Sequence, residues 1–214
     1  MKKISEIEKM MFLSTMFTLL LVAVRFIITR NEVYLFYPWN LFLAGIPLLL
    51  SRQLQIFKKI NLKVLLVLAF WLLFLPNAPY LITDLIHFQE RPPVPYWFDI
   101  LIVTSGAWNG VAFGFISLMQ AERFLSRHIK TKWRMPATVA LLLLCSYGIY
   151  LGRFLRYNSW DIFIKPGDIL LTTINNVLHP FQYMQFWGFT FSFAALLCLM
   201  YFTIKKLPEM MKAA

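Results

Sequence analysis

The fold is decided by residues 64–83, which read VLLVLAFWLLFLPNAPYLIT and contain no charged side chain. A helix of about 20 mostly apolar residues crosses a hydrocarbon core about 30 Å thick. Other stretches of the chain have the same character, and they lie at 11–29, 33–50, 99–120, 136–152 and 183–204. The sequence therefore predicts an all-α fold, a polytopic integral membrane bundle with six transmembrane helices in a single domain, 1–214.

The composition of the whole chain agrees with a membrane protein. Of its 214 residues 59% are hydrophobic and 14% charged, whereas about 25% are charged in an average soluble domain. The net charge of +11 could suggest a nucleic-acid partner, but in so apolar a chain Lys and Arg are expected in membrane loops. We therefore expect contact with membrane lipid and none with nucleic acid. Cys145 and Cys198 each lie inside an apolar run, which excludes a disulfide framework and a Cys-based zinc finger.

The basic residues predict how the chain is oriented. The N-terminus, the connections 51–63 and 121–135, and the C-terminal tail hold fifteen Lys and Arg, whereas the remaining connections hold five. Because positive charge collects on the cytoplasmic side, both termini are predicted to be cytoplasmic. Arg25 falls near the outer end of the first predicted helix, where we expect its side chain to snorkel to the membrane surface.

The connection 153–182 contains a further helical pattern at 168–181. One face of this pattern is apolar and carries Leu170, Ile174, Val177, Leu178 and Phe181. The opposite face is polar and carries Asp168, Thr172, Asn175, His179 and Gln182. The pattern predicts a helix that either lies in the membrane interface or re-enters the membrane.

Polar side chains gather toward the end of the third predicted helix. Asn77, Tyr80, Asp84 and His87 would share one face if the helix survives Pro76 and Pro79. Two interpretations stay open. In one, Asn77 caps broken backbone and the charged groups simply stand in water; in the other, Asp84 and His87 are catalytic acid and base, with Asn77 and Tyr80 binding substrate.

The fourth predicted helix carries a strip of glycines at Gly106, Gly110 and Gly114. Small residues four apart let another helix approach closely, so we favour a packing role for this strip. The helix it contacts could belong to the same chain, to a partner or to a homo-oligomer. Asn109 beside the strip is a candidate for a hydrogen bond across that contact, or for substrate binding.

The end of the fifth predicted helix carries two arginines, Arg153 and Arg156, among aromatic residues. Planar guanidinium groups match phosphate oxygens, so the pair could hold a phosphate, but it could equally form ion pairs or snorkel to headgroups. Asn158 and Asp161 follow as further substrate-binding candidates. Their spacing also resembles a helix start, so capping alone would explain Asp161.

A divalent metal site is a further hypothesis. Asp84, His87 and His179 would supply a carboxylate and two imidazoles to zinc, with one coordination position open to water. Asp84 and His87 form only a D-x-x-H pattern, which is weak by itself. The sequence contains no Walker loop, G-x-S-x-G elbow, H-E-x-x-H helix or dinucleotide fingerprint.

Three motifs resemble one protein family. They are WLLFLPNAPYLITDLIH at 71–87, SGAWNG at 105–110 and LGRFLRYNSWD at 151–161, and they resemble the family of domain of unknown function 1361. The resemblance implies a bacterial multi-span protein, hence the inner membrane, and no particular reaction. The candidates inside these motifs are Asn77, Asp84, His87, Arg153, Arg156, Asn158 and Asp161.

Together these patterns favour a polar, outward-facing site that binds or processes an anionic lipid or isoprenoid-phosphate headgroup. In this hypothesis the arginines hold phosphate, and His87 and Arg153 converge to within roughly 10 Å in one pocket. If the protein is an enzyme, hydrolysis or headgroup transfer is the expected class. A small permease and a structural or assembly subunit of a membrane complex are the alternatives.

Overall fold

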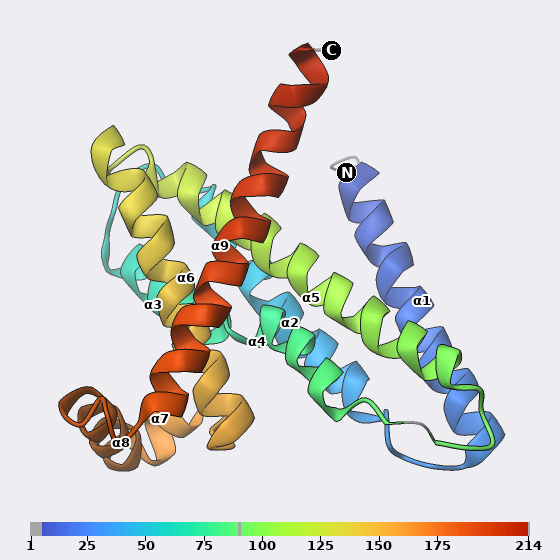
Figure 1. The fold of residues 1–214 in the computed structure, drawn as a ribbon. Coiled ribbons are helices and arrows are strands. Elements are labelled where there is room, and N and C mark those ends of the chain that lie inside the picture. Colours follow the sequence, from blue (N-terminus) through green and yellow to red (C-terminus); the bar gives the residue numbers. More distant parts are fainter. Residues whose placement is uncertain (1–5, 90, 214) are drawn as a thin grey trace. The chain divides into compact units, whose positions relative to one another are not determined.

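The computed structural model describes the backbone of residues 6–89 and 91–213, and their side chains except those of His87 and of 209–213. Every regular element in these ranges is a helix, and no strand occurs among them (Figure 1). Contacts divide the chain into two compact units, unit 1 (Met1–Phe124) and unit 2 (Leu125–Ala214). The single domain expected for 1–214 stays a prediction.

The helices follow the order expected from the sequence. Unit 1 contains α1 (Glu6–Thr29), α2 (Phe36–Leu54), α3 (Leu62–Phe74), α4 (Asn77–Tyr80), the 3₁₀ helix η1 (Leu81–His87) and α5 (Tyr96–Leu125). Unit 2 contains α6 (Thr131–Phe154), α7 (Asp161–Ile164), α8 (Pro166–Leu178) and α9 (Met184–Ala213).

The predicted all-α membrane bundle is confirmed, but the count of six spans is not. Five segments of the described chain are long and apolar enough to cross a membrane, and they are Glu6–Thr29, Leu62–Ile86, Tyr96–Leu125, Thr131–Phe154 and Met184–Pro208. The helix α2 is long enough, but its polar residues, including Asn40 and Arg52, lower its mean hydropathy. Much of α2 is instead buried inside unit 1, where a neighbouring helix rather than lipid covers it.

The third predicted helix is broken at its two prolines. It runs as α3 to Phe74, then as α4 and η1, because Pro76 and Pro79 lack the N–H groups that a continuous helix needs. Backbone hydrogen bonds continue around the prolines: the Ala78 N–H donates to the Leu75 carbonyl three residues earlier at 3.2 Å, and the Tyr80 N–H to the Pro76 carbonyl four residues earlier at 3.0 Å. The break therefore leaves backbone groups bonded within the chain, as a membrane environment requires.

The glycine strip of α5 makes close helix contacts inside unit 1, as its spacing predicts. A Cβ atom placed on Gly110 would lie 2.2 Å from the Ala78 carbonyl oxygen, and one on Gly106 would lie 2.2 Å from the Tyr37 ring. At Gly114 the nearest atoms belong to Ala78 and Pro79, at 3.3 Å. The atoms that approach the glycines belong to the same chain. The helices in close contact with the strip are therefore α2, α4 and η1.

Asn109 joins α5 to α1 in the middle of unit 1. Its side chain is 1% exposed, and its amide nitrogen donates to the Thr18 hydroxyl at 2.9 Å and to the Ser14 carbonyl at 3.2 Å. The Thr15 hydroxyl lies 3.4 Å from its amide oxygen. Asn109 therefore bonds to α1 rather than across the contact of the glycine strip, and these bonds engage its amide nitrogen. Substrate binding by Asn109 stays a prediction.

Replacing Asn109 with alanine should lower the free energy of unfolding by about 1–2 kcal/mol, because Thr18 and Ser14 lose their donor. Reversible unfolding in detergent measures the change. Thr104→Ala is the matched control, since Thr104 is exposed on the same helix and should leave the stability within about 0.5 kcal/mol. Equal stability of the two variants would contradict a role for Asn109 in joining α1 to α5.

In unit 2, α6 packs along α9, and α8 is tied to both. The Tyr147 hydroxyl on α6 hydrogen-bonds the Thr173 hydroxyl on α8, and the Trp187 indole on α9 donates to the Asn176 carbonyl at 3.0 Å. The helix expected at 168–181 ends earlier, at Leu178, because Pro180 disfavours helical geometry at His179.

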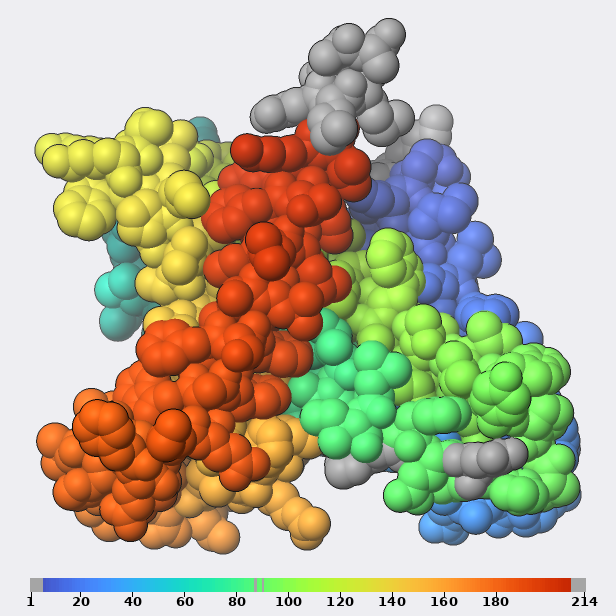
Figure 2. Space-filling model, viewed as in Figure 1, coloured from blue at the N-terminus to red at the C-terminus, as the bar shows by residue number. Residues whose placement is uncertain are grey.

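The apolar face of α8 is exposed, as its pattern predicts for a helix that contacts lipid. Its members are 40–66% exposed, and they are Leu170, Leu171, Ile174, Val177 and Leu178. In Figure 2 this helix lies within the orange surface. Thr173 and Asn176, which bond to α6 and α9, are not among these apolar residues, so α8 is held by another part of its surface.

Candidate functional site

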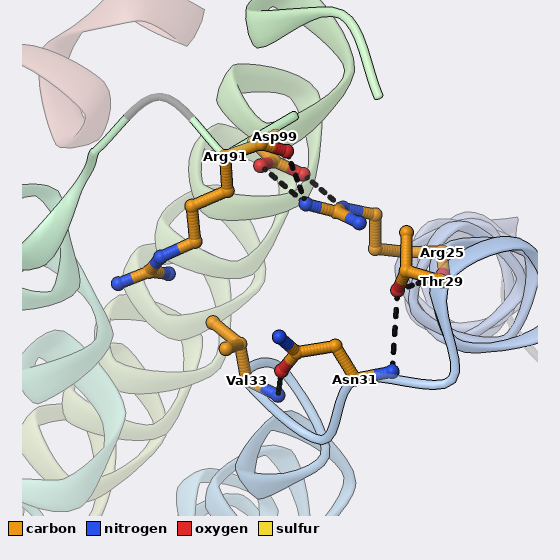
Figure 3. Close-up of polar contacts among 6 residues, drawn as sticks. All are labelled: Arg25, Thr29, Asn31, Val33, Arg91 and Asp99. Carbon is orange, nitrogen blue, oxygen red and sulfur yellow. Dashed lines mark hydrogen bonds and ion pairs between the residues drawn. The ribbon is translucent and has the colours of Figure 1, made fainter. Parts of the chain in front are cut away.

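A buried ion pair lies at one end of unit 1, between α1 and α5 (Figure 3). The Arg25 Nε atom lies 2.7 Å from Asp99 Oδ1, and Arg25 Nη2 lies 3.2 Å from Asp99 Oδ2. The side chains of Arg25 and Asp99 are 6% and 0% exposed. The expected snorkelling of Arg25 is therefore wrong, because its guanidinium is satisfied by a carboxylate inside the protein.

The same arginine fixes the loop that leads into α5. Arg25 Nη2 donates to the Arg91 carbonyl at 2.9 Å, and the Arg91 guanidinium lies 5.8 Å from the centre of the Tyr34 ring. Figure 1 shows that the connection from α1 to α2 and that from η1 to α5 lie at the same end of unit 1. These contacts hold the two connections together.

The turn after α1 is ordered by its own polar side chains (Figure 3). The Thr29 hydroxyl donates to the Arg25 carbonyl at 2.8 Å and accepts from the Asn31 N–H at 3.3 Å. The Asn31 side chain then accepts from the Val33 N–H at 3.0 Å, which forms a local turn. The end of α1 is therefore well defined where it supports the ion pair.

Asp84 is buried in the 3₁₀ helix η1 that approaches this end of the unit. It is 5% exposed, and its neighbour Thr83 is 2% exposed. In a 3₁₀ helix residues three apart lie on the same side, so Asp84 and His87 share a register position. The side chain of His87 lies outside the described residues, so its role as acid, base or ligand stays a prediction.

Asn77, a further polar candidate of the broken helix, bonds to nearby backbone, as does Thr83. The Asn77 amide donates to the Phe74 carbonyl at 3.0 Å, and the Thr83 hydroxyl donates to the Tyr80 carbonyl at 2.6 Å. Asn77 and Tyr80 are half-buried. The Asn77 bond is the capping arrangement that the sequence left open, while substrate binding by Asn77 and Tyr80 stays a prediction.

The candidates of unit 2 lie where α6 ends. Arg153 is half-buried in the last turn of α6, whereas Arg156 is exposed beyond the helix in a left-handed conformation, with φ 60°. The Asn158 N–H donates to Asp161 Oδ2 at 2.7 Å, and the Asn158 amide reaches the same oxygen at 3.3 Å. Asp161 thus makes the helix-start contact that its spacing indicates, at the beginning of α7.

The hypothetical zinc ligands come from different parts of the chain. Asp84 belongs to unit 1, whereas His179 is exposed at the end of α8 in unit 2. Within the described side chains, which exclude His87, no group of three His, Cys, Asp or Glu residues could hold a metal ion. A zinc site formed with His87 therefore stays a prediction.

Arg25 and Asp99 were not among the residues that the sequence singled out as a site. The signal was nevertheless present, because each is a lone charge at the outward end of a predicted helix and their signs are opposite. A charge in such a position is expensive unless it finds a partner. Matching lone charges of opposite sign that the sequence places at the same end of the predicted helices would have predicted this ion pair.

A family model described as "Protein of unknown function (DUF1361)" matches residues 39–200. The matched range runs from α2 into α9 and contains the candidate residues of both units. No curated protein and no solved structure matches the chain.

Proposed function

The chain belongs to the DUF1361 family of unknown function, and on that premise we propose that this membrane protein binds the phosphate-bearing headgroup of an anionic lipid or isoprenoid. The proposed site is polar and lies at the outward ends of its helices. The observation that carries this proposal is the burial of Asp84, which is 5% exposed in a chain with five apolar, span-length helices.

A buried carboxylate in such a chain is costly and usually has a functional role. Asp84 also lies in the segment that the prolines break, and irregular backbone at membrane depth occurs where it is buried in protein or lines a cavity. This position suits an acid or base that acts on a polar headgroup. We therefore assign Asp84 and His87 to acid and base chemistry, of which hydrolysis or headgroup transfer is the proposed class.

Arg153 and Arg156 are the proposed phosphate ligands. A guanidinium donates two parallel hydrogen bonds to phosphate oxygens and remains charged at any physiological pH. Arg156 is exposed at the end of α6, so an incoming headgroup can reach it. The contact between Asn158 and Asp161 shapes the loop that follows these arginines.

Substituting both arginines with glutamine should weaken binding of phosphatidylglycerol or of a polyprenyl phosphate at least about tenfold, since each lost charge-assisted bond is worth about 1.5–3 kcal/mol. Binding is measured on protein in nanodiscs of neutral lipid. Arg127→Gln is the control, because Arg127 is exposed in the connection predicted to be cytoplasmic. Unchanged binding in the double variant, or an equal loss in Arg127→Gln, would contradict the proposed site.

A structural or assembly role is the second candidate, and one observation favours it. The polar side chains of Asn109, Arg25 and Trp71 all bond to other helices of unit 1, so they stabilise the fold. A stoichiometric partner that copurifies with the protein would support this role. A permease is less favoured, because Asn109 is a polar residue that would line its path, and its amide is bonded to α1.

A further inference from the structure

A cleft of about 600 Å³ opens between the first turns of α1 and the last turn of α2. Its lining residues are Glu8, Lys9, Phe12, Leu13 and Arg52. All of them belong to unit 1. Glu8 precedes Arg25 by 17 residues of one helix, or about 25 Å at 1.5 Å per residue, so the cleft is separate from the ion-pair end of the unit.

Charges of both signs line this cleft. Arg52 Nη2 lies 2.9 Å from Glu8 Oε1, and the two side chains are 41% and 34% exposed. Lys9 Nζ lies 2.7 Å from Glu6 Oε1 and is also exposed. Exposed ion pairs of this kind are weak. A ligand that carries a positive and a negative charge can therefore replace these pairs with its own contacts at little cost in free energy.

The apolar lining residues of the cleft follow the charged ones along α1. Phe12 and Leu13 follow Glu8 and Lys9 by one helical turn, and they are 62% and 58% exposed. Because α1 is apolar enough to span a membrane, this end of the helix lies where headgroups give way to acyl chains. The order from charged to apolar residues matches the order from headgroup to acyl chain in a phospholipid.

We infer that this cleft binds a phospholipid whose headgroup carries a primary ammonium, with its phosphate at Arg52 and Lys9, its ammonium at Glu8, and an acyl chain along Phe12 and Leu13. A purely anionic headgroup would meet the Glu8 carboxylate, which repels it. A choline headgroup carries a positive charge but no N–H donor, so it cannot hydrogen-bond that carboxylate. Phosphatidylethanolamine has the required phosphate and donor.

Lipid retention tests this site directly. The protein is reconstituted with equal amounts of phosphatidylethanolamine, phosphatidylcholine and phosphatidylglycerol, then extracted, and the retained lipids are counted by native mass spectrometry. We expect the wild type to retain phosphatidylethanolamine about fivefold over phosphatidylcholine, the factor that one hydrogen bond of about 1 kcal/mol gives. Retention in the supplied ratio, or a preference for phosphatidylglycerol, would overturn the inference.

Two variants and one control locate the binding. Glu8→Gln should reduce the preference for phosphatidylethanolamine over phosphatidylcholine to about one, and Arg52→Gln should lower retention of all three lipids. Lys58→Gln, an exposed change in the neighbouring connection, should leave the ratios unchanged. An unchanged preference in Glu8→Gln would overturn the assignment of the ammonium to this carboxylate.

A competition on the wild type keeps the test independent of how the variants fold. Soluble glycerophosphoethanolamine should displace retained phosphatidylethanolamine, whereas glycerophosphoglycerol at the same concentration should not. Equal displacement by the two compounds, or none by either, would overturn the inference. Because the cleft does not include the proposed phosphate ligands of α6, neither result depends on the proposed function.

Discussion

Replacing Gly110 with leucine is expected to lower the free energy of unfolding by about 3 kcal/mol or more, or to prevent folding of unit 1. A Cβ atom at this position would lie 2.2 Å from the Ala78 carbonyl oxygen and 3.0 Å from Leu81 Cβ. Neither neighbour can yield easily, because one is backbone at the helix break and the other is a buried side chain. Unfolding of the purified protein in detergent measures the effect.

Gly45→Leu is the matched control for this substitution. It adds the same side chain to a helical glycine of unit 1, but a Cβ atom at Gly45 meets nothing within 4 Å. We expect it to keep or slightly raise the stability, since leucine favours the helix over glycine by up to about 1 kcal/mol. If the two leucine variants unfolded alike, the close contact of α5 with the broken helix would be wrong.

Asp99→Asn is expected to lower the free energy of unfolding by about 3–5 kcal/mol, because it leaves the Arg25 guanidinium buried without its counter-charge. Asp99 is fully buried and holds two nitrogens of that guanidinium. The measurement is again reversible unfolding in detergent. The substitution keeps the size of the side chain, so the loss reports the charge rather than the packing.

Two further variants separate the ion pair from other causes. The double variant Arg25→Met with Asp99→Leu removes both charges and should recover most of the stability lost in Asp99→Asn. Arg52→Gln breaks the exposed pair with Glu8 and should cost at most about 1 kcal/mol. A double variant no more stable than Asp99→Asn would mean that the pair does more than neutralise two buried charges.

Helix positions could be predicted because apolar length and spacing are local properties of the sequence. The glycine strip of α5 was predicted to make a close helix contact, and the contact is present at Gly106 and Gly110. The break at Pro76 and Pro79 was also visible, since proline removes backbone donors. The length of α8 was overestimated because the pattern extended across Pro180, where helical geometry at His179 is disfavoured.

The count of spans could not be predicted from length alone. A helix that its neighbours cover can carry polar residues, and α2 buries Tyr37 and Ser51 inside unit 1. Whether such a helix crosses the membrane depends on packing that a window of sequence does not contain. The orientation of the termini, which was derived from six spans, therefore stays a prediction.

The candidate site was only partly accessible to sequence reasoning. Local contacts followed from spacing, as for Asn158 with Asp161, which are three residues apart. The ion pair of Arg25 with Asp99 joins residues 74 positions apart, and the sequence offers two lone charges but no distance between them. The proposed convergence of His87 with Arg153 has the same long-range character and stays a prediction.

The distance between His87 and Arg153 tests the proposed outward site most directly. Cysteines are placed at these two positions after Cys145 and Cys198 are replaced with alanine, and a thiol cross-linker about 10 Å long, the width of one bound ligand, is added to intact membranes. A pair at His87 and Arg127 serves as the control. The account predicts an efficient cross-link for the first pair and none for the control, whereas labelling of both single cysteines without a cross-link between 87 and 153 would contradict a shared site.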